Sequence, residues 1–131
     1  MPKKTIVAPA AGRPAGPYSQ AVMAGNWIFV SGEKGVDPAT GKIVDGGIAA
    51  QTRQALTNIK AVLQAAGASM ADVVRCGVYM ADTDDFQLMN EAYAAFFPTD
   101  PPARSTVIVA ALPLGLEVLI EVTAYLDNPG K

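Results

Sequence analysis

Residues 48–67 read IAAQTRQALTNIKAVLQAAG and show the clearest helical pattern of the chain. Apolar side chains recur there at the spacing of one helical face, namely at Ala55, Leu56, Ile59, Val62, Leu63 and Ala66. Gly67 comes directly after this face, at the place where a left-handed residue commonly ends a helix. The pattern therefore predicts an amphipathic helix that begins near Ile48 and ends before Gly67.

The segments before this helix are typical of β-structure. Two short apolar runs, 18–23 and 27–31, are separated by Gly25-Asn26, a pair that suits a tight turn between antiparallel strands. We expect a hairpin there, followed by a turn at 37–41, which reads DPATG. The Pro- and Gly-rich stretch 9–17 is expected to form an arm that leads into the fold.

The segments after the helix continue the alternation of strand and helix. Residues 72–80 are rich in Val and Tyr and predict a strand. A second helix is capped by Asp82 or Thr83 and stopped by Pro98, Pro101 and Pro102, with Phe86, Met89, Tyr93 and Phe96 or Phe97 on its apolar face. Residues 103–112 and 118–126 complete the pattern as two strands joined across Pro113 and Gly115.

The predicted order is β-β-α-β-α-β-β, which places the chain in the α+β class. Two helices are enough to cover one face of a mainly antiparallel sheet, so the other face must pack elsewhere. The length of 131 residues predicts a single domain over residues 1–131. Only 17% of the residues are charged, against a usual share of about 25%, and we therefore expect the open face to meet another subunit.

The composition excludes several kinds of catalytic site. The chain has no histidine and one cysteine, Cys76, which rules out Ser-His-Asp and Cys-His devices, His-rich metal sites and zinc sites built from several thiolates. Cys76 lies in a predicted apolar strand, where a small buried residue is expected rather than a reactive thiol. Catalysis must therefore depend on carboxylate, Tyr, Ser, Thr, Arg, Lys or bound water.

Charge and hydropathy narrow the expected partners and location. The formal net charge is −2 and the basic residues are scattered, so a nucleic-acid partner is not expected. No apolar stretch approaches the length of about 20 residues that spans a bilayer. The first residues, MPKK, lead into Pro9 and Gly12 rather than into an apolar signal core. We expect a soluble, cytoplasmic protein that does not contact membranes.

Four segments together resemble one known family. They are 16–21 (GPYSQA), 30–32 (VSG), 90–93 (NEAY) before Phe96-Phe97, and 102–105 (PARS). In this order and spacing they are similar to the Rid (YjgF-like, reactive intermediate deaminase) family, and 37–41 and 65–69 extend the resemblance over nearly the whole chain. Each short motif is weak alone, whereas the ordered set is specific.

The resemblance implies a chorismate-mutase-like (YjgF-like) fold, a homotrimer whose sheets form a central barrel, and ligand clefts between subunits. It also implies an enamine/imine deaminase that converts 2-aminoacrylate and related 2-imino acids to 2-keto acids and ammonia, with no metal and no organic cofactor. An imine carbon is already electrophilic, so such an enzyme needs only to hold the acid, place a water and favour proton transfer.

Arg104 matches the family's arginine for the substrate carboxylate. A guanidinium is always charged, and its planar fork meets a carboxylate through two parallel hydrogen bonds. Lysine would not hold the plane of a conjugated substrate as firmly. An exposed strand arginine without a function is the alternative.

Glu121 is the second predicted catalytic residue, because the resemblance implies a glutamate on the last strand that orients the attacking water. The register leaves two alternatives. With a connection after Pro113 that is two residues longer than in many relatives, Glu121 takes this place, and without it the place falls to Leu119. A shift of two residues keeps the same strand face, so Glu121 is expected to point toward the cleft in both cases.

Four further residues match family positions around the ligand. Tyr18, Ser31 and Asn90 offer hydroxyl and amide groups that hydrogen-bond an amine or a developing hydroxyl. Thr106 stands where several relatives have cysteine and shares the strand alternation of Arg104. All four are predicted to bind substrate, although Tyr18, Ser31 and Asn90 each also suit a structural role.

Glu33 and Lys34 depart from the family pattern, which usually has Ser-Gly-Gln and then an apolar residue. A negative charge near the cleft would weaken carboxylate binding unless Lys34 or Arg104 offsets it, so these residues bear on substrate choice. The leading alternative function is a noncatalytic small-molecule-binding or chaperone-like protein that uses the same cleft. Endoribonuclease activity, attributed to some relatives, ranks third because this acidic chain lacks histidine.

Overall fold

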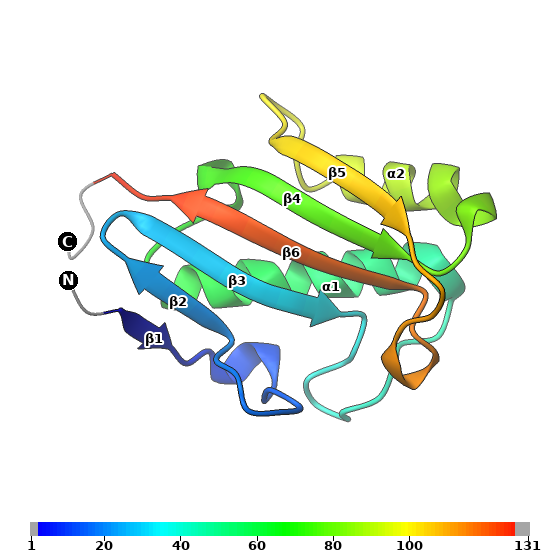
Figure 1. Ribbon diagram of the computed structural model, residues 1–131, viewed down its shortest axis with the longest axis horizontal. Helices are drawn as coiled ribbons and strands as arrows, with labels where there is room; N and C mark the ends of the chain where they lie inside the picture. The colour runs from blue at the N-terminus through cyan, green and yellow to red at the C-terminus, as the bar shows by residue number, and fades with distance from the viewer. Residues whose placement is uncertain (1–2, 128–131) are drawn as a thin grey trace.

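The computed structural model describes residues 3–127, which form one six-stranded sheet with two α-helices on one of its faces (Figure 1). The strands are β1 (Lys4–Ile6), β2 (Ala21–Ala24), β3 (Trp27–Lys34), β4 (Val73–Met80), β5 (Ala103–Ile108) and β6 (Val118–Tyr125). The helices are α1 (Gly47–Ala65) and α2 (Phe86–Ala94), and short 3₁₀ turns lie at η1 (Pro9–Ala11), η2 (Met70–Asp72), η3 (Thr83–Asp85) and η4 (Pro113–Gly115).

The strand order in the sheet is β1-β2-β3-β6-β4-β5. All neighbouring pairs are antiparallel except β4 and β5, which are parallel because α2 lies between them in the chain and returns it to the same end of the sheet. The last strand in sequence, β6, is therefore central, between β3 and β4. The mixed α+β architecture with a mainly antiparallel sheet confirms the predicted fold class.

The predicted elements are all present, and one strand was not predicted. β1 pairs with β2 through Lys4↔Met23 and Ile6↔Ala21, so the observed order is β-β-β-α-β-α-β-β. A strand of three residues is too short to show alternation, and only its partner defines it. The second helix begins directly after η3. The Asp82 carboxylate caps η3 by accepting a hydrogen bond from the Asp84 backbone N–H, whereas α2 itself has Asp85 at its N-cap and no side-chain cap.

The core lies between the helices and the covered face of the sheet. Ala55, Leu56, Ile59, Val62 and Leu63 of α1 have no exposed surface, as the helical pattern predicts. Each large apolar side chain buried in this way contributes roughly 1.5–3 kcal/mol. Within residues 3–127, no helix combines the length and the hydropathy that crossing a bilayer would require.

The opposite face of the sheet carries exposed apolar side chains. Trp27 and Tyr125 form an edge-to-face pair with ring centroids 4.9 Å apart, and each is about two-fifths exposed. Phe29 and Val107 project from the same face and are 48% and 45% exposed. Apolar side chains that share one sheet face in this way are typical of a surface that packs against another protein.

Candidate functional site

Five of the six predicted site residues form two groups that lie apart in one copy of the chain, and the sixth, Glu121, lies on β6. Tyr18 and Ser31 lie at the β2–β3 side of the sheet, whereas Asn90, Arg104 and Thr106 lie on α2 and β5. The strand order places β6 and β4 between β3 and β5, so the two groups do not meet within one copy.

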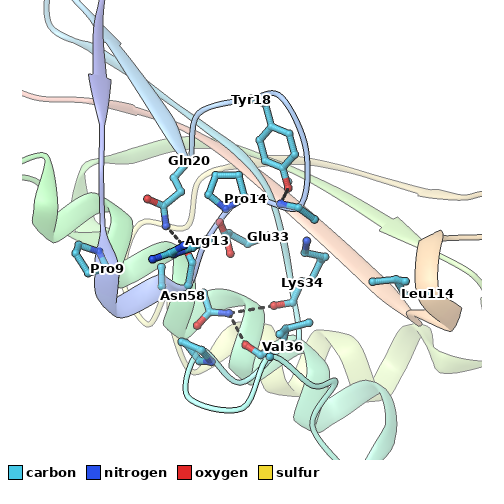
Figure 2. Close-up of a pocket in the computed structure, with 16 residues that line it drawn as sticks. Pro9, Arg13, Pro14, Tyr18, Gln20, Glu33, Lys34, Val36, Asn58 and Leu114 are labelled. Carbon is cyan, nitrogen blue, oxygen red and sulfur yellow. Dashed lines mark hydrogen bonds between the residues drawn. The ribbon is translucent and has the colours of Figure 1, made fainter.

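Tyr18 of the first group borders a cavity of about 490 Å³, whose lining residues do not include Ser31. Its walls are the loop 9–18, the end of β3, the start of the following loop and Asn58 of α1, with Leu114 at the rim. Arg13, Tyr18, Glu33 and Lys34 are its ionisable lining residues. Figure 2 shows Glu33 in the centre of this view, with Tyr18 above it and Asn58 below.

Hydrogen bonds hold the loop that forms one wall. The buried Gln20 amide accepts from the Ala8 N–H at 2.7 Å and donates to the Ala8 carbonyl at 2.9 Å and to the Gly12 carbonyl. The Ser31 hydroxyl donates to the Ser19 carbonyl at 2.6 Å. The predicted arm at 9–17 is thus a fixed part of the fold, and the Ser31 hydroxyl supports it.

Tyr18 lines this cavity with an exposed ring. Its hydroxyl accepts a hydrogen bond from the Ala15 N–H at 3.1 Å, and 45% of the side chain is exposed. The hydroxyl hydrogen is left to donate to a ligand, since a phenol both donates and accepts.

The opposite wall depends on Asn58, which is 2% exposed. Its amide donates to the Lys34 and Val36 carbonyls at 3.1 and 3.0 Å and connects α1 to the end of β3. Gly35 makes this approach possible, because a Cβ there would lie 2.5 Å from Cα of Gln51. This close packing of β3 against α1 thus fixes the position of Glu33 and Lys34, the two residues before Gly35.

Glu33 is directed into this region by a β-bulge. Val30 pairs with Val122 but Glu33 pairs with Ile120, so β3 holds one extra residue between these two pairs. Since Val122 and Ile120 both face the helices, the bulge turns Glu33 to the helix side and Lys34, the partner of Leu119, to the open side. Burial raises the pKa of Glu33 from 4.5 to about 7, while the Lys34 charge acts in the opposite direction.

Arg104 rests on an apolar shelf made by α2. Its guanidinium carbon lies 4.7 Å from the centroid of the Tyr93 ring and 5.8 Å from that of Phe86, and one of its nitrogens lies 4.0 Å from the Met89 sulfur. The aromatic faces attract the cation and hold its plane. Within residues 3–127 no carboxylate lies at ion-pair distance from it, so its hydrogen-bonding fork is available to a ligand.

Thr106 lies beside Arg104 on the helix side of β5, as the alternation predicts. Arg104 pairs with Cys76 and Thr106 with Val78, both of which are buried under the helices. The Thr106 hydroxyl is buried and has no hydrogen-bond partner within residues 3–127. Asn90 is half-buried on α2. Burial raises the pKa of the Cys76 thiol, in agreement with the predicted inert cysteine.

Glu121 projects from the open face of the sheet, on the same side as Leu119. Its carboxylate accepts a hydrogen bond from the Tyr79 hydroxyl at 3.0 Å, which raises the pKa of Tyr79. It lines a separate hollow of about 170 Å³ together with Phe29 and Arg75. On β6 it is Leu119, not Glu121, that packs against Gly32 of the cavity wall, since a Cβ at Gly32 would lie 3.1 Å from the Leu119 side chain.

Three residues that build the cavity were not singled out from the sequence: Arg13, Gln20 and Asn58. Arg13 lies in the stretch interpreted only as an arm. Gln20 belongs to a recognised motif, and its role in holding the loop depends on contacts with Ala8 and Gly12. Asn58, like Gln51 and Thr52, is a polar residue on the buried face of α1, and a polar residue at such a position indicates a polar contact.

Comparisons with known proteins agree with this architecture. The sequence profile of the family described as Endoribonuclease L-PSP matches residues 6–126. A RutC family protein of Pyrococcus horikoshii is 50% identical over 123 residues, covering 94% of this chain and 98% of that protein. A bovine (Bos taurus) protein named 2-iminobutanoate/2-iminopropanoate deaminase is 48% identical over 120 residues, covering 92% of this chain and 85% of its own.

A solved structure gives the same result in three dimensions. RidA from an Antarctic Psychrobacter species superposes with a TM-score of 0.91 at 43% sequence identity, covering 94% of this chain and 99% of that one. The sheet with two helices on one face is thus the YjgF-like fold. The chain belongs to the Endoribonuclease L-PSP family, which is the Rid (YjgF-like) family that its four motifs indicate.

Proposed function

We propose that this protein is an enamine/imine deaminase that hydrolyses 2-aminoacrylate and small 2-imino acids to 2-keto acids and ammonia. The single observation that carries the proposal is the guanidinium of Arg104, held over the Tyr93 ring with no carboxylate partner in residues 3–127. The bovine relative, named as a deaminase of 2-iminobutanoate and 2-iminopropanoate, supports the same reaction. Both of its named substrates are small imino acids.

The carboxylate of such a substrate binds to Arg104 in this proposal. Two parallel N–H···O bonds from a guanidinium fix both the position and the plane of a carboxylate. Because the imine is conjugated with that carboxylate, the same contact orients the C=N bond. The hydroxyl of Thr106 lies on the helix side of β5, and Asn90 belongs to α2. In this proposal both groups complete this part of the site.

The remaining groups come from a second copy of the chain. Tyr18 and Ser31 hydrogen-bond the substrate nitrogen or the developing hydroxyl, and Glu121 aligns the water that attacks the imine carbon. The carbinolamine then expels ammonia and leaves the keto acid. Positioning of this kind lowers a barrier by up to about 7–11 kcal/mol in favourable cases.

A homotrimer with shared sites is the assembly that fits this proposal. The two residue groups lie apart in one copy, and the open face of the sheet presents Trp27, Phe29 and Val107. Packing these open faces around a threefold axis would bury the apolar side chains and form a central barrel. We propose no metal, no organic cofactor and no nucleic-acid partner.

The test is a coupled assay in which a dehydratase generates 2-aminoacrylate or 2-iminobutyrate and the loss of the imine is followed. We expect the wild type to accelerate the loss and Arg104→Ala to lose about 100-fold in kcat/KM, the equivalent of roughly 2.7 kcal/mol. Arg53→Ala, which removes an exposed arginine from α1, is the matched control. Equal decay with wild type and Arg104→Ala would remove the deaminase proposal.

A noncatalytic ligand-binding protein is the second candidate. The observation that favours it is Leu119, an apolar residue of β6 that packs against Gly32 beside the Tyr18 cavity. Binding of a 2-keto acid by the wild type without acceleration of imine loss would support this alternative. RNA cleavage is not proposed, because the chain has a net charge of −2 and no histidine.

A further inference from the structure

Glu33 is an ionisable group in the Tyr18 cavity to which the reaction described above assigns no role. The bulge between Val30 and Glu33 turns this side chain toward the helices, away from the face that simple alternation would give it. Bulges often redirect a side chain beside an active site. The carboxyl group thus lines the 490 Å³ cavity together with Tyr18, whereas Glu121 lines a different hollow.

We propose that Glu33 is the proton-transfer group of this site, which gives a proton to the imine nitrogen and takes one from the attacking water. This inference rests on the proposed deaminase function and assigns it a further catalytic residue. Leu119, the β6 residue that packs against Gly32, is apolar and cannot transfer protons. The carboxyl group of Glu33, the residue after Gly32, takes this role in the proposal.

The proton balance closes on Glu33 alone. The protonated carboxyl first donates to the C=N nitrogen and makes the carbon more electrophilic. As water forms the C–O bond, the carboxylate accepts the proton that the water loses, giving the carbinolamine. That proton then passes to the amine, the C–N bond breaks, and Glu33 recovers a proton from the hydroxyl as the C=O bond forms and ammonia leaves.

The surroundings suit a carboxyl group that alternates between two protonation states. Arg13 from the N-terminal loop and Lys34 from β3 are the cations of the cavity wall, and Tyr18 is its other titratable group. The helix α1 contributes neutral Asn58, and its Gln51 donates a hydrogen bond at 2.9 Å to Glu117, the residue that precedes β6. No side chain within residues 3–127 hydrogen-bonds the Glu33 carboxyl group, which leaves it free for substrate and water.

Electrostatics agree with this geometry. Burial raises the pKa of Glu33 from 4.5 to about 7, so both forms are populated near neutral pH. A general acid–base group is most effective when its pKa lies near the working pH. An amide at this position could not exchange protons in this way, because it has no ionisation near neutral pH.

The experiment compares the pH dependence of kcat in wild type, Glu33→Gln and Asp45→Asn, after subtraction of the uncatalysed imine loss at each pH. Asp45 is exposed and outside the cavity, so its variant controls for loss of one negative charge. We expect Glu33→Gln to lower kcat by about 10²–10⁴-fold, to change KM less, and to remove the ionisation near neutral pH. Asp45→Asn should keep both the rate and the ionisation.

A wild-type profile that survives in Glu33→Gln, whether or not kcat falls, would overturn the inference and leave the deaminase function standing. A wild type without deaminase activity would instead remove the proposed function, and this inference with it. Should Glu33→Gln fail to fold, ¹³C NMR of the wild-type glutamate carboxyl groups replaces it. One glutamate should titrate near neutral pH and shift when pyruvate binds, and absence of that signal would equally overturn the inference.

Discussion

Arg104 and Glu121 point to opposite faces of the same sheet. Arg104 pairs with Cys76 and Glu121 pairs with Gly77, and consecutive residues of a strand direct their side chains to opposite sides. One copy of the chain therefore does not bring the two predicted catalytic residues together. A site that uses both must take Arg104 from one copy and Glu121 from another.

Mixing two impaired variants tests such a shared site. Arg104→Ala and Glu121→Ala should each lose most of the activity alone, because every site lacks one group. If they are unfolded, mixed and refolded in equal amounts, about a quarter of the sites in a cyclic assembly should hold both intact residues. The measurement is deaminase activity of the mixture, with wild type carried through the same unfolding and refolding as the reference for recovery. Activity equal to the mean of the two separate variants would contradict a site shared between copies.

The open face of the sheet is expected to hold the copies together. Phe29 is 48% exposed on that face, and Phe29→Asp would place a charge in the interface, where it loses its hydration. We expect light scattering to find a trimer for the wild type and a monomer for Phe29→Asp. Leu88→Asp, which changes a 51% exposed apolar residue of α2 on the other side of the sheet, should stay trimeric. A wild type that is monomeric would sink both the trimer and the shared site.

Glu33 should make stability depend on pH. Its pKa is raised from 4.5 to about 7 by folding, so between these values the folded state binds more protons than the unfolded state. Stability from this group is therefore present at low pH and lost as the pH rises through about 7. In urea denaturation, the free energy of unfolding of Glu33→Gln minus that of the wild type should be larger at about pH 8 than at about pH 5. An equal difference at both pH values would show that Glu33 titrates normally.

The side chain of Asn58 should contribute strongly to the free energy of unfolding. Asn58→Ala removes the donors to the Lys34 and Val36 carbonyls and leaves both without this partner. We expect a loss of about 1–3 kcal/mol in the free energy of unfolding, measured by urea denaturation. Thr57→Ala is the matched control, because its exposed hydroxyl bonds only the Arg53 carbonyl of its own helix. Equal losses in the two variants would mean that the connection between α1 and β3 is not essential.

Much of the fold could be predicted because its signals are local. The helical spacing from Ile48 onward and the Gly25-Asn26 turn each depend on residues that are a few positions apart in the chain, and each is confirmed. The strand β1 escaped prediction because three residues are defined only by their pairing with β2, about 17 residues away in the chain. The cavity wall at 9–17 escaped for the same reason, since Gln20 fixes it through nonlocal hydrogen bonds.

The same distinction applies to the candidate site. The sequence by itself determined the family, the two helices, the position of Arg104 in its motif and the shared side of Arg104 and Thr106, because strand alternation is a property of neighbouring residues. Only the tertiary structure decided that Arg104 and Glu121 lie on opposite faces and that Glu33 turns inward beside Tyr18. Both facts depend on which residues pair across strands and on one extra residue in β3, and long-range pairing leaves no periodic trace in the sequence.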